Sequence, residues 1–205
     1  MRQLSMVMIA CALSVGEARA DEREWRLSIS GVVSDAMAKS DSIAGGGINP
    51  GTRLRFGFGA RNWLELGGTA GFTWAPAVVF PNRVIQGQSG NLHTDIVAVE
   101  MGGSVRLVGD LPFGRGFFAR NRPYLDLRTG LLLEILRSPK LLDQQNDIVL
   151  DLSESVTPRA FLGVVVGLEH RFAGSWIGGI SFDYVFAGRD FQTLGANLEF
   201  SYLTY

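Results

Sequence analysis

Two histidines are the residues of this 205-residue chain whose surroundings could support hydrolysis. His93 lies near Ser89, Thr94 and Asp95, and a hydroxyl, an imidazole and a carboxylate are the groups of a nucleophilic triad. Closeness in sequence does not establish a triad, however, because the geometry must also bring the groups together. His170 has no Ser or Asp beside it on its face of the predicted strand, which favours a structural role. We therefore predict no catalytic residue.

Metal and phosphate sites are equally poorly supported. The run Gly45–Gly47 does not connect a strand to a helix, as a phosphate-binding loop would. Four spaced carboxylates could attract Ca²⁺, but they lack EF-hand spacing and are typical of a solvated loop: Asp143, Asp147, Asp151 and Glu154. We predict neither a cofactor nor a metal.

The first twenty residues have the pattern of a cleavable signal peptide. Arg2 supplies a positive start, Leu4 to Val15 is an apolar run, and Ala18-Arg19-Ala20 is a small-x-small cleavage site. The alternative is a lipoprotein signal ending at Cys11, which would have a very short apolar core. Cleavage after Ala20 would remove the chain's single cysteine and leave residues 21–205 as one exported domain.

Composition excludes several classes of protein. The 19 basic and 20 acidic residues are balanced, whereas a nucleic-acid-binding protein normally shows a basic excess. No run of 18 apolar residues appears, so we expect no transmembrane helix in the mature chain.

From Trp25 onward, large apolar residues alternate with small or charged ones in segments separated by turn-forming residues. A period of two predicts β-strands with one apolar face. Eight such segments are visible, at 25–33, 52–60, 64–74, 95–108, 124–136, 159–172, 176–186 and 191–202. The sequence therefore predicts an all-β protein, an eight-stranded antiparallel up-and-down barrel.

The connections between the segments differ in length. Residues 34–51, 75–94 and 137–158 are predicted to be long loops, whereas 61–63 and 173–175 are tight turns. Membrane barrels have long outer loops and short periplasmic turns. Two connections depart from the rule, because 109–123 is long and 187–190 is short.

Charged residues and glycines share the face opposite to the apolar one. Seven are basic and seven acidic: Arg26, Arg53, Arg55, Arg106, Arg128, Arg159, Arg171, Glu65, Glu100, Asp126, Glu134, Glu169, Asp183 and Glu199. A water-facing strand has no reason to prefer glycine, but a narrow lumen does, because each long Arg or Glu needs a small neighbour. The pattern therefore favours a transmembrane barrel with a charged, glycine-rich interior over a soluble lipocalin-like carrier.

Aromatic residues gather at the ends of the predicted strands, as in the girdles of membrane barrels. Trp25, Phe172, Trp176 and Tyr202 fall at the periplasmic ends, and Trp74, Tyr184, Phe186 and Phe191 fall at the outer ends.

The last segment, Phe200-Ser201-Tyr202-Leu203-Thr204-Tyr205, resembles the C-terminal strand of outer-membrane proteins. Tyr205 is aromatic and terminal, but one residue out of phase with Phe200 and Tyr202. Together with the eight segments, the chain resembles the OmpA transmembrane domain and the OmpX-like small barrels. The resemblance implies a bacterial outer-membrane location, contact with outer-membrane lipid and lipopolysaccharide, and biogenesis through the barrel-assembly machinery.

These features predict a non-catalytic integral barrel that acts as a structural, docking or adhesion element of the envelope, or as a subunit of a larger envelope complex. Paired charges in so narrow a lumen should cross-link the walls and act as a plug. Two alternatives stay open. Some small outer-membrane barrels modify lipid A, which would place chemistry at His93, and the lumen could also be a small pore for ions or solutes.

Overall fold

The computed structural model describes residues 24–36, 48–109, 121–188 and 191–204, so the predicted signal peptide lies outside the described part. Nine strands occur in it: β1 (Trp25–Ala36), β2 (Asn49–Arg61), β3 (Leu64–Ile85), β4 (Gln88–Val108), β5 (Asn121–Leu142), β6 (Ile148–Asp151), β7 (Ser155–Ala173), β8 (Trp176–Phe186) and β9 (Gln192–Thr204). Among these residues there is no helix of the length and apolarity needed to cross a membrane.

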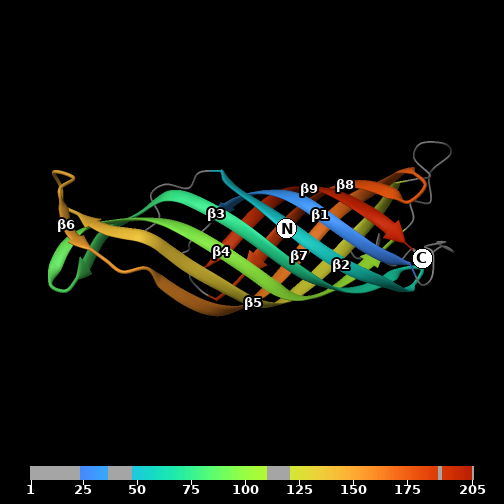
Figure 1. Cartoon of the computed structure of the whole chain (residues 1–205), viewed down its shortest axis with the longest axis horizontal. Coiled ribbons are helices and arrows are strands. Elements are labelled where there is room, and N and C mark those ends of the chain that lie inside the picture. Colours follow the sequence, from blue (N-terminus) through green and yellow to red (C-terminus); the bar gives the residue numbers. More distant parts are fainter. Residues whose placement is uncertain (1–23, 37–47, 110–120, 189–190, 205) are drawn as a thin grey trace, which may run out of the picture.

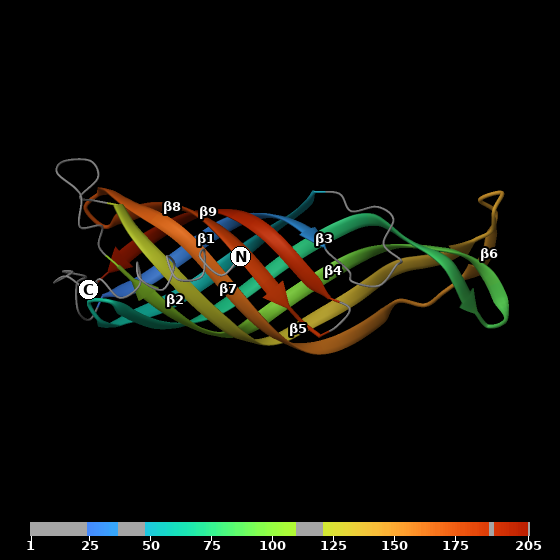
Figure 2. The ribbon, with the colours of Figure 1, turned by 180° about the vertical axis from the view of Figure 1, so that it is seen from behind.

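Eight of the strands close into a barrel. The order is β4-β3-β2-β1-β9-β8-β7-β5, and β4 pairs with β5 to complete the ring. All neighbouring strands are antiparallel, and Figures 1 and 2 show the tilted strands from two sides. The predicted eight-stranded antiparallel barrel is confirmed. The short strand β6 is an addition that the sequence did not predict; it pairs only with the outer end of β5.

Strict alternation gives the barrel an apolar outside and a polar inside. Along β9, Leu198 and Phe200 are 60% and 57% exposed, whereas Asn197, Glu199 and Ser201 are buried. A soluble carrier would place the apolar side chains inside. The barrel does the opposite, as a lipid-facing surface requires.

One end of the barrel holds the tight turns, and we assign it to the periplasm. The β2–β3 turn lies at Asn62 and Trp63, and the β7–β8 turn at Gly174 and Ser175. The register of β1 pairs Trp25 with both Phe58 and Thr204, so the two described chain ends meet there.

Aromatic side chains lie on the outer surface near both ends. Trp25 stacks on Phe56 with ring centroids 4.9 Å apart, and Trp176 lies 5.0 Å from Tyr202 at the same end. At the opposite end Trp74, Tyr184 and Phe186 are about as exposed as these, at 41%, 39% and 41%. β8 runs for 11 residues from Trp176 to Phe186, which matches the length of one membrane crossing.

Three neighbouring strands continue well beyond the membrane. β3 and β5 have 22 residues each and β4 has 21, about twice the length of β8. The predicted long loops at 75–94 and 137–158 are therefore wrong over most of their length. We call the projecting part, residues 75–95 and 137–151, the outer sheet; it extends to the left in Figure 1.

Backbone irregularities explain why the outer sheet has no clear period of two. Register shifts lie between Ala75 and Val78 and between Phe80 and Arg83, next to Pro76 and Pro81. Each shift reverses the face on which the next residues lie. The hairpin closes at Gln86 and Gly87, both with positive φ (53° and 82°), as a two-residue turn between antiparallel strands requires.

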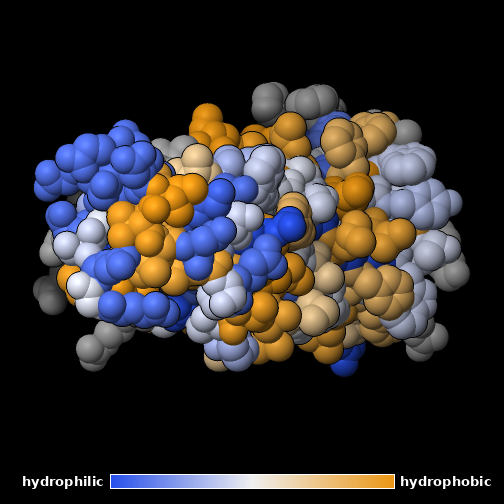
Figure 3. All heavy atoms as spheres, turned by 60° about the vertical axis from the view of Figure 1, so that its left-hand side comes forward, coloured by the Kyte–Doolittle hydropathy of each residue, from blue (hydrophilic) through white to orange (hydrophobic). Residues whose placement is uncertain are grey.

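The surface of the outer sheet differs from that of the barrel wall. Figure 3 shows apolar residues spread over the wall, and hydrophilic residues around a smaller apolar patch where the outer sheet comes forward. On the outward face, Trp74 pairs with Val97, and Val97 pairs with Ile135. The next outward pair is charged, Asp95 with Arg137, so the surface changes from apolar to polar at this level. This boundary places the outer sheet outside the hydrocarbon layer.

The lipid-facing assignment predicts a contrast between two exposed apolar residues. Phe182, near the middle of β8, is 67% exposed, and Val84 in the outer sheet is 71% exposed. Phe182→Arg should lower the free energy of unfolding in lipid vesicles by about 2–4 kcal/mol, because the charge would lie near the bilayer midplane. Val84→Arg should change it by less than about 0.5 kcal/mol. Equal effects in denaturant titrations of the two variants would contradict the membrane boundary.

Candidate functional site in the barrel lumen

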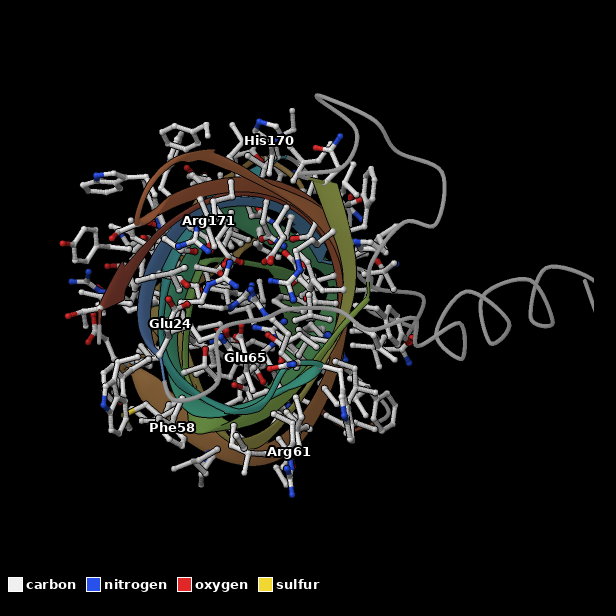
Figure 4. All side chains as sticks on the ribbon, turned by 90° about the vertical axis from the view of Figure 1, so that its right-hand side faces the viewer. Glu24, Phe58, Arg61, Glu65, His170 and Arg171 are labelled. Carbon is white, nitrogen blue, oxygen red and sulfur yellow. The ribbon has the colours of Figure 1, made fainter. Side chains whose placement is uncertain are left out.

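The lumen is filled by charged side chains from all eight strands of the ring. In Figure 4, seen from the periplasmic end, Glu65 and Arg171 point into the barrel, whereas Phe58 and His170 lie on its outer side. The charges form two clusters, one nearer the periplasm and one nearer the outer mouth.

The periplasmic ion cluster is built on three arginines. Arg106 donates from both terminal nitrogens to the two carboxylate oxygens of Glu199, at 2.9 Å each. Arg26 donates to Glu169 at 2.7 Å and to Glu65 at 3.1 Å. The cluster therefore connects β1, β3, β4, β7 and β9 across the lumen.

Further contacts extend the periplasmic ion cluster. Arg55 donates to Glu65 at 2.8 Å and lies 3.5 Å from Asp126. Sequence reasoning missed Tyr124, whose ring lies 4.2 Å from the guanidinium of Arg106. Tyr124 lies two residues before Asp126 and therefore on the same face of β5. This spacing is the sequence feature that could have placed Tyr124 in the lumen.

The outer ion cluster is a closed ring of two arginines and two carboxylates. Arg128 donates to Glu100 at 2.9 Å and to Asp183 at 3.0 Å. Arg53 donates to Asp183 at 3.0 Å and its Nε also donates to Glu100. All four side chains are at most 10% exposed. Each charge thus has two opposite charges as neighbours, which a buried ion needs because it has lost its hydration.

The other predicted lumen charges lie outside these clusters. Arg159 donates to Glu134 at 2.7 Å, and both side chains are partly exposed, at 25% and 14%. Arg171 lies near the periplasmic mouth, 4.0 Å from Glu24. The structure therefore brings eleven of the fourteen predicted charges into the two clusters and leaves Glu134, Arg159 and Arg171 apart from them.

Glycines provide the space that the clusters occupy. A Cβ atom at Gly195 would lie 2.2 Å from Asp183 Oδ1, and one at Gly71 would lie 2.6 Å from a Glu100 oxygen. At Gly57 it would lie 2.8 Å from Arg55. Any larger residue at these positions would displace a charged partner.

An apolar layer lies beyond the outer ion cluster. Leu132, Phe161, Val185 and Ala187 are at most 3% exposed, and Phe191 packs against them. The prediction that Phe191 belongs to the outer girdle is therefore wrong. Its inward position follows from the alternation of β9, in which Gly195 and Asn197 face the lumen and Leu194 faces outward.

Three of the groups considered for catalysis make other contacts. Asp95 accepts a hydrogen bond from the backbone of Ala77 at 2.8 Å, and Thr94 donates to the carbonyl of Arg137 at 3.0 Å. His170 is 2.8 Å from the side chain of Asn121. These contacts hold backbone and strand ends in place.

The acidic segment around Asp143 has a structural role of its own. Asp143 accepts hydrogen bonds from the backbone of Gln145 and Asp147, both at 2.9 Å, and so stabilises the turn before β6. Within the described ranges, no three His, Cys, Asp or Glu side chains come together in a way that could hold a metal ion.

Comparisons with known proteins identify the fold. No protein-family model and no curated protein matches the chain. Among solved structures, the attachment invasion locus protein Ail of Yersinia pestis, in complex with the heparin analogue sucrose octasulfate, is 14% identical with a TM-score of 0.54, covering 89% of this chain and 99% of that one. Neisserial surface protein A is also 14% identical with a TM-score of 0.57, covering 87% and 96%.

A third match, OprG from Pseudomonas aeruginosa, is 12% identical with a TM-score of 0.52 and covers 90% of this chain and 97% of that one. The chain folds as a small outer-membrane β-barrel. This is the architecture expected from the resemblance to the OmpA transmembrane domain and the OmpX-like barrels. With its apolar outer surface and aromatic ends, the barrel belongs in the bacterial outer membrane.

The burial of the periplasmic ion cluster predicts a large cost for removing one arginine. Arg106→Met would leave Glu199 and Asp126 without their nearest cation in an enclosed lumen, so unfolding free energy should fall by about 3–5 kcal/mol. The matched control is Arg137→Met, since Arg137 and its partner Glu154 are 61% and 56% exposed and such pairs contribute at most about 1 kcal/mol. The measurement is urea titration of the folded barrel in vesicles. A cost for Arg106→Met no larger than that of the control would refute the role of the cluster.

Proposed function

We propose that this protein is a non-catalytic, non-conducting outer-membrane barrel that presents the outer sheet as a docking or adhesion element. The observation that carries the proposal is the combination of a lumen filled by ion pairs with one wall that rises far beyond the membrane. A lumen closed in this way favours a scaffold over a pore, and a projecting sheet offers the protein a surface for contact.

The construction of the outer sheet supports a contact surface. Val78 and Ile96 are buried with Ala75, and Phe80 and Leu136 pack against them, so an apolar cluster joins the base of the outer sheet to the barrel. β6 adds a fourth strand through its pairing with β5. An ordered sheet can hold side chains in fixed positions, which lowers the entropic cost of binding a partner.

The free edge of β3 favours contact through a face of the sheet. Beyond Thr73, which pairs with Gly51 at the end of β2, no described strand pairs with β3 on this side. Pro76 and Pro81 lack the backbone N–H that edge pairing uses, and the two register shifts bend the edge. Such an edge resists pairing with another β-strand.

Non-catalytic action rests on the engagement of the candidate groups. Asp95 and Thr94 hydrogen-bond the backbone beside His93, which argues against a lipid A-modifying site there.

We also propose that lipopolysaccharide surrounds the outer half of the barrel and that the barrel-assembly machinery inserts it. Phe200 and Tyr202 face outward along β9. The pairing of β9 with its neighbours has no register shift up to Thr204, and Tyr205 lies outside the described residues.

An envelope protein partner is the second form of docking that we propose. We propose the long connection 109–123 as its contact; β5 begins at Asn121, and 110–120 lies outside the described residues.

Removal of the outer sheet tests the proposal. A variant in which residues 76–95 and 138–154 are each replaced by Asn-Gly turns should insert into the outer membrane as the intact chain does, because the barrel wall is retained. Cells that display the intact chain should adhere to a mammalian cell layer or to one another more strongly than cells that display the shortened chain. Heat-modified migration on gels controls for folding, and equal adherence at equal surface level would contradict the proposal.

A further inference from the structure

The outer mouth of the barrel contains a hollow with a charged floor and apolar walls. Its volume is about 790 Å³, including the part open to solvent. Arg53, Glu100 and Asp183 of the outer ion cluster form its floor. Phe80 of the outer sheet and Val185 of β8 are among its apolar wall residues. We call this hollow the outer vestibule; its mixture of apolar walls and few polar groups is typical of small-molecule sites.

Two acceptor atoms at the edge of the floor are unsatisfied. Ser34 and Asp183 both line the outer vestibule and are 6% and 3% exposed. Within the described part of the protein, neither Ser34 Oγ nor Asp183 Oδ1 has a hydrogen-bond partner. The other oxygen of Asp183 accepts from Arg53 and Arg128. Buried polar atoms are normally paired. Asp183 Oδ1 can only accept a hydrogen bond and the Ser34 hydroxyl can also accept one, so the two atoms mark a place for a donor.

The register brings these two acceptors to either side of one glycine. Gly195 pairs with Ser34 on β1 and with Asp183 on β8. A Cβ atom at Gly195 would lie 2.2 Å from Asp183 Oδ1, so the glycine is what allows the carboxylate oxygen to occupy this position. Asp183 Oδ1 therefore lies over Gly195, on the side of Asp183 that faces the strand of Ser34.

The unpaired atoms of the lining determine the kind of ligand group. Glu100, Glu134 and Asp183 line the hollow, and each is paired with a guanidinium. Asp183 Oδ1 takes no part in these hydrogen bonds and, as a carboxylate oxygen, can only accept one. A carboxylate head group has no donor for it, whereas an ammonium group is compact and carries three donors, enough to reach both Asp183 Oδ1 and the hydroxyl of Ser34.

We propose that the outer vestibule binds a small amphiphilic primary amine. Its ammonium group donates to Ser34 Oγ and Asp183 Oδ1, and its apolar body packs against Phe80 and Val185. This site goes beyond docking through the outer sheet and does not depend on it, because binding is measured on the purified barrel whether or not cells adhere.

Calorimetric titration of the full barrel in lipid nanodiscs with 2-phenylethylamine tests the site, with empty nanodiscs as the blank. 2-Phenylethanol and 3-phenylpropionate have the same ring with a neutral or an anionic head, and both should bind at least about tenfold more weakly. Ser34→Ala should weaken amine binding by about tenfold, since it removes a hydrogen bond to a charged group. It should not impair folding, because the hydroxyl it removes is unpartnered among the described residues.

Ser28→Ala is the matched control. Ser28 faces the lumen from the same strand, but it hydrogen-bonds Ser201 at 2.9 Å and does not line the outer vestibule. The proposal predicts unchanged amine affinity in this variant. Absence of amine binding, equal affinity for the alcohol or the acid, or equal affinity in the Ser34→Ala and wild-type barrels would each overturn the proposal.

Discussion

A charge enclosed in an eight-stranded lumen must be paired, and the rest of this structure depends on that constraint. Neither bulk water nor lipid can solvate a guanidinium at 1% or 2% exposure, as found for Arg128, Arg106 and Arg26. Each therefore contacts at least two carboxylates. The partners come from different strands, so every pair also fixes the relative register of the strands that carry it.

The same constraint accounts for the glycines and for the apolar outside. Gly71 and Gly195 leave room for Glu100 and Asp183, which would otherwise be pushed out of the ring of the outer ion cluster. Because the charged groups are paired with one another inside, the outward face is free to be apolar. Stability and closure of the lumen are thus two results of one arrangement.

Period-two alternation was enough to predict the ring of eight strands and the face on which each charge lies. It could not say which charges meet, because Arg53 and Asp183 are separated by 130 residues and contact one another only after closure of the barrel. Phe191 faces inward because it is in phase with Gly195, although its position at a strand end is typical of a girdle residue. The outer sheet was missed because prolines and two register shifts interrupt the alternation that identifies a strand.

The central claim is that the two ion clusters close the lumen, and single-channel recording of the purified barrel in a planar bilayer tests it most directly. The account predicts no steady, large conductance over a range of voltages, because Arg53 and Asp183 join strands from different sides of the lumen at the floor of the outer vestibule. A steady, large single-channel current from the folded protein would contradict it.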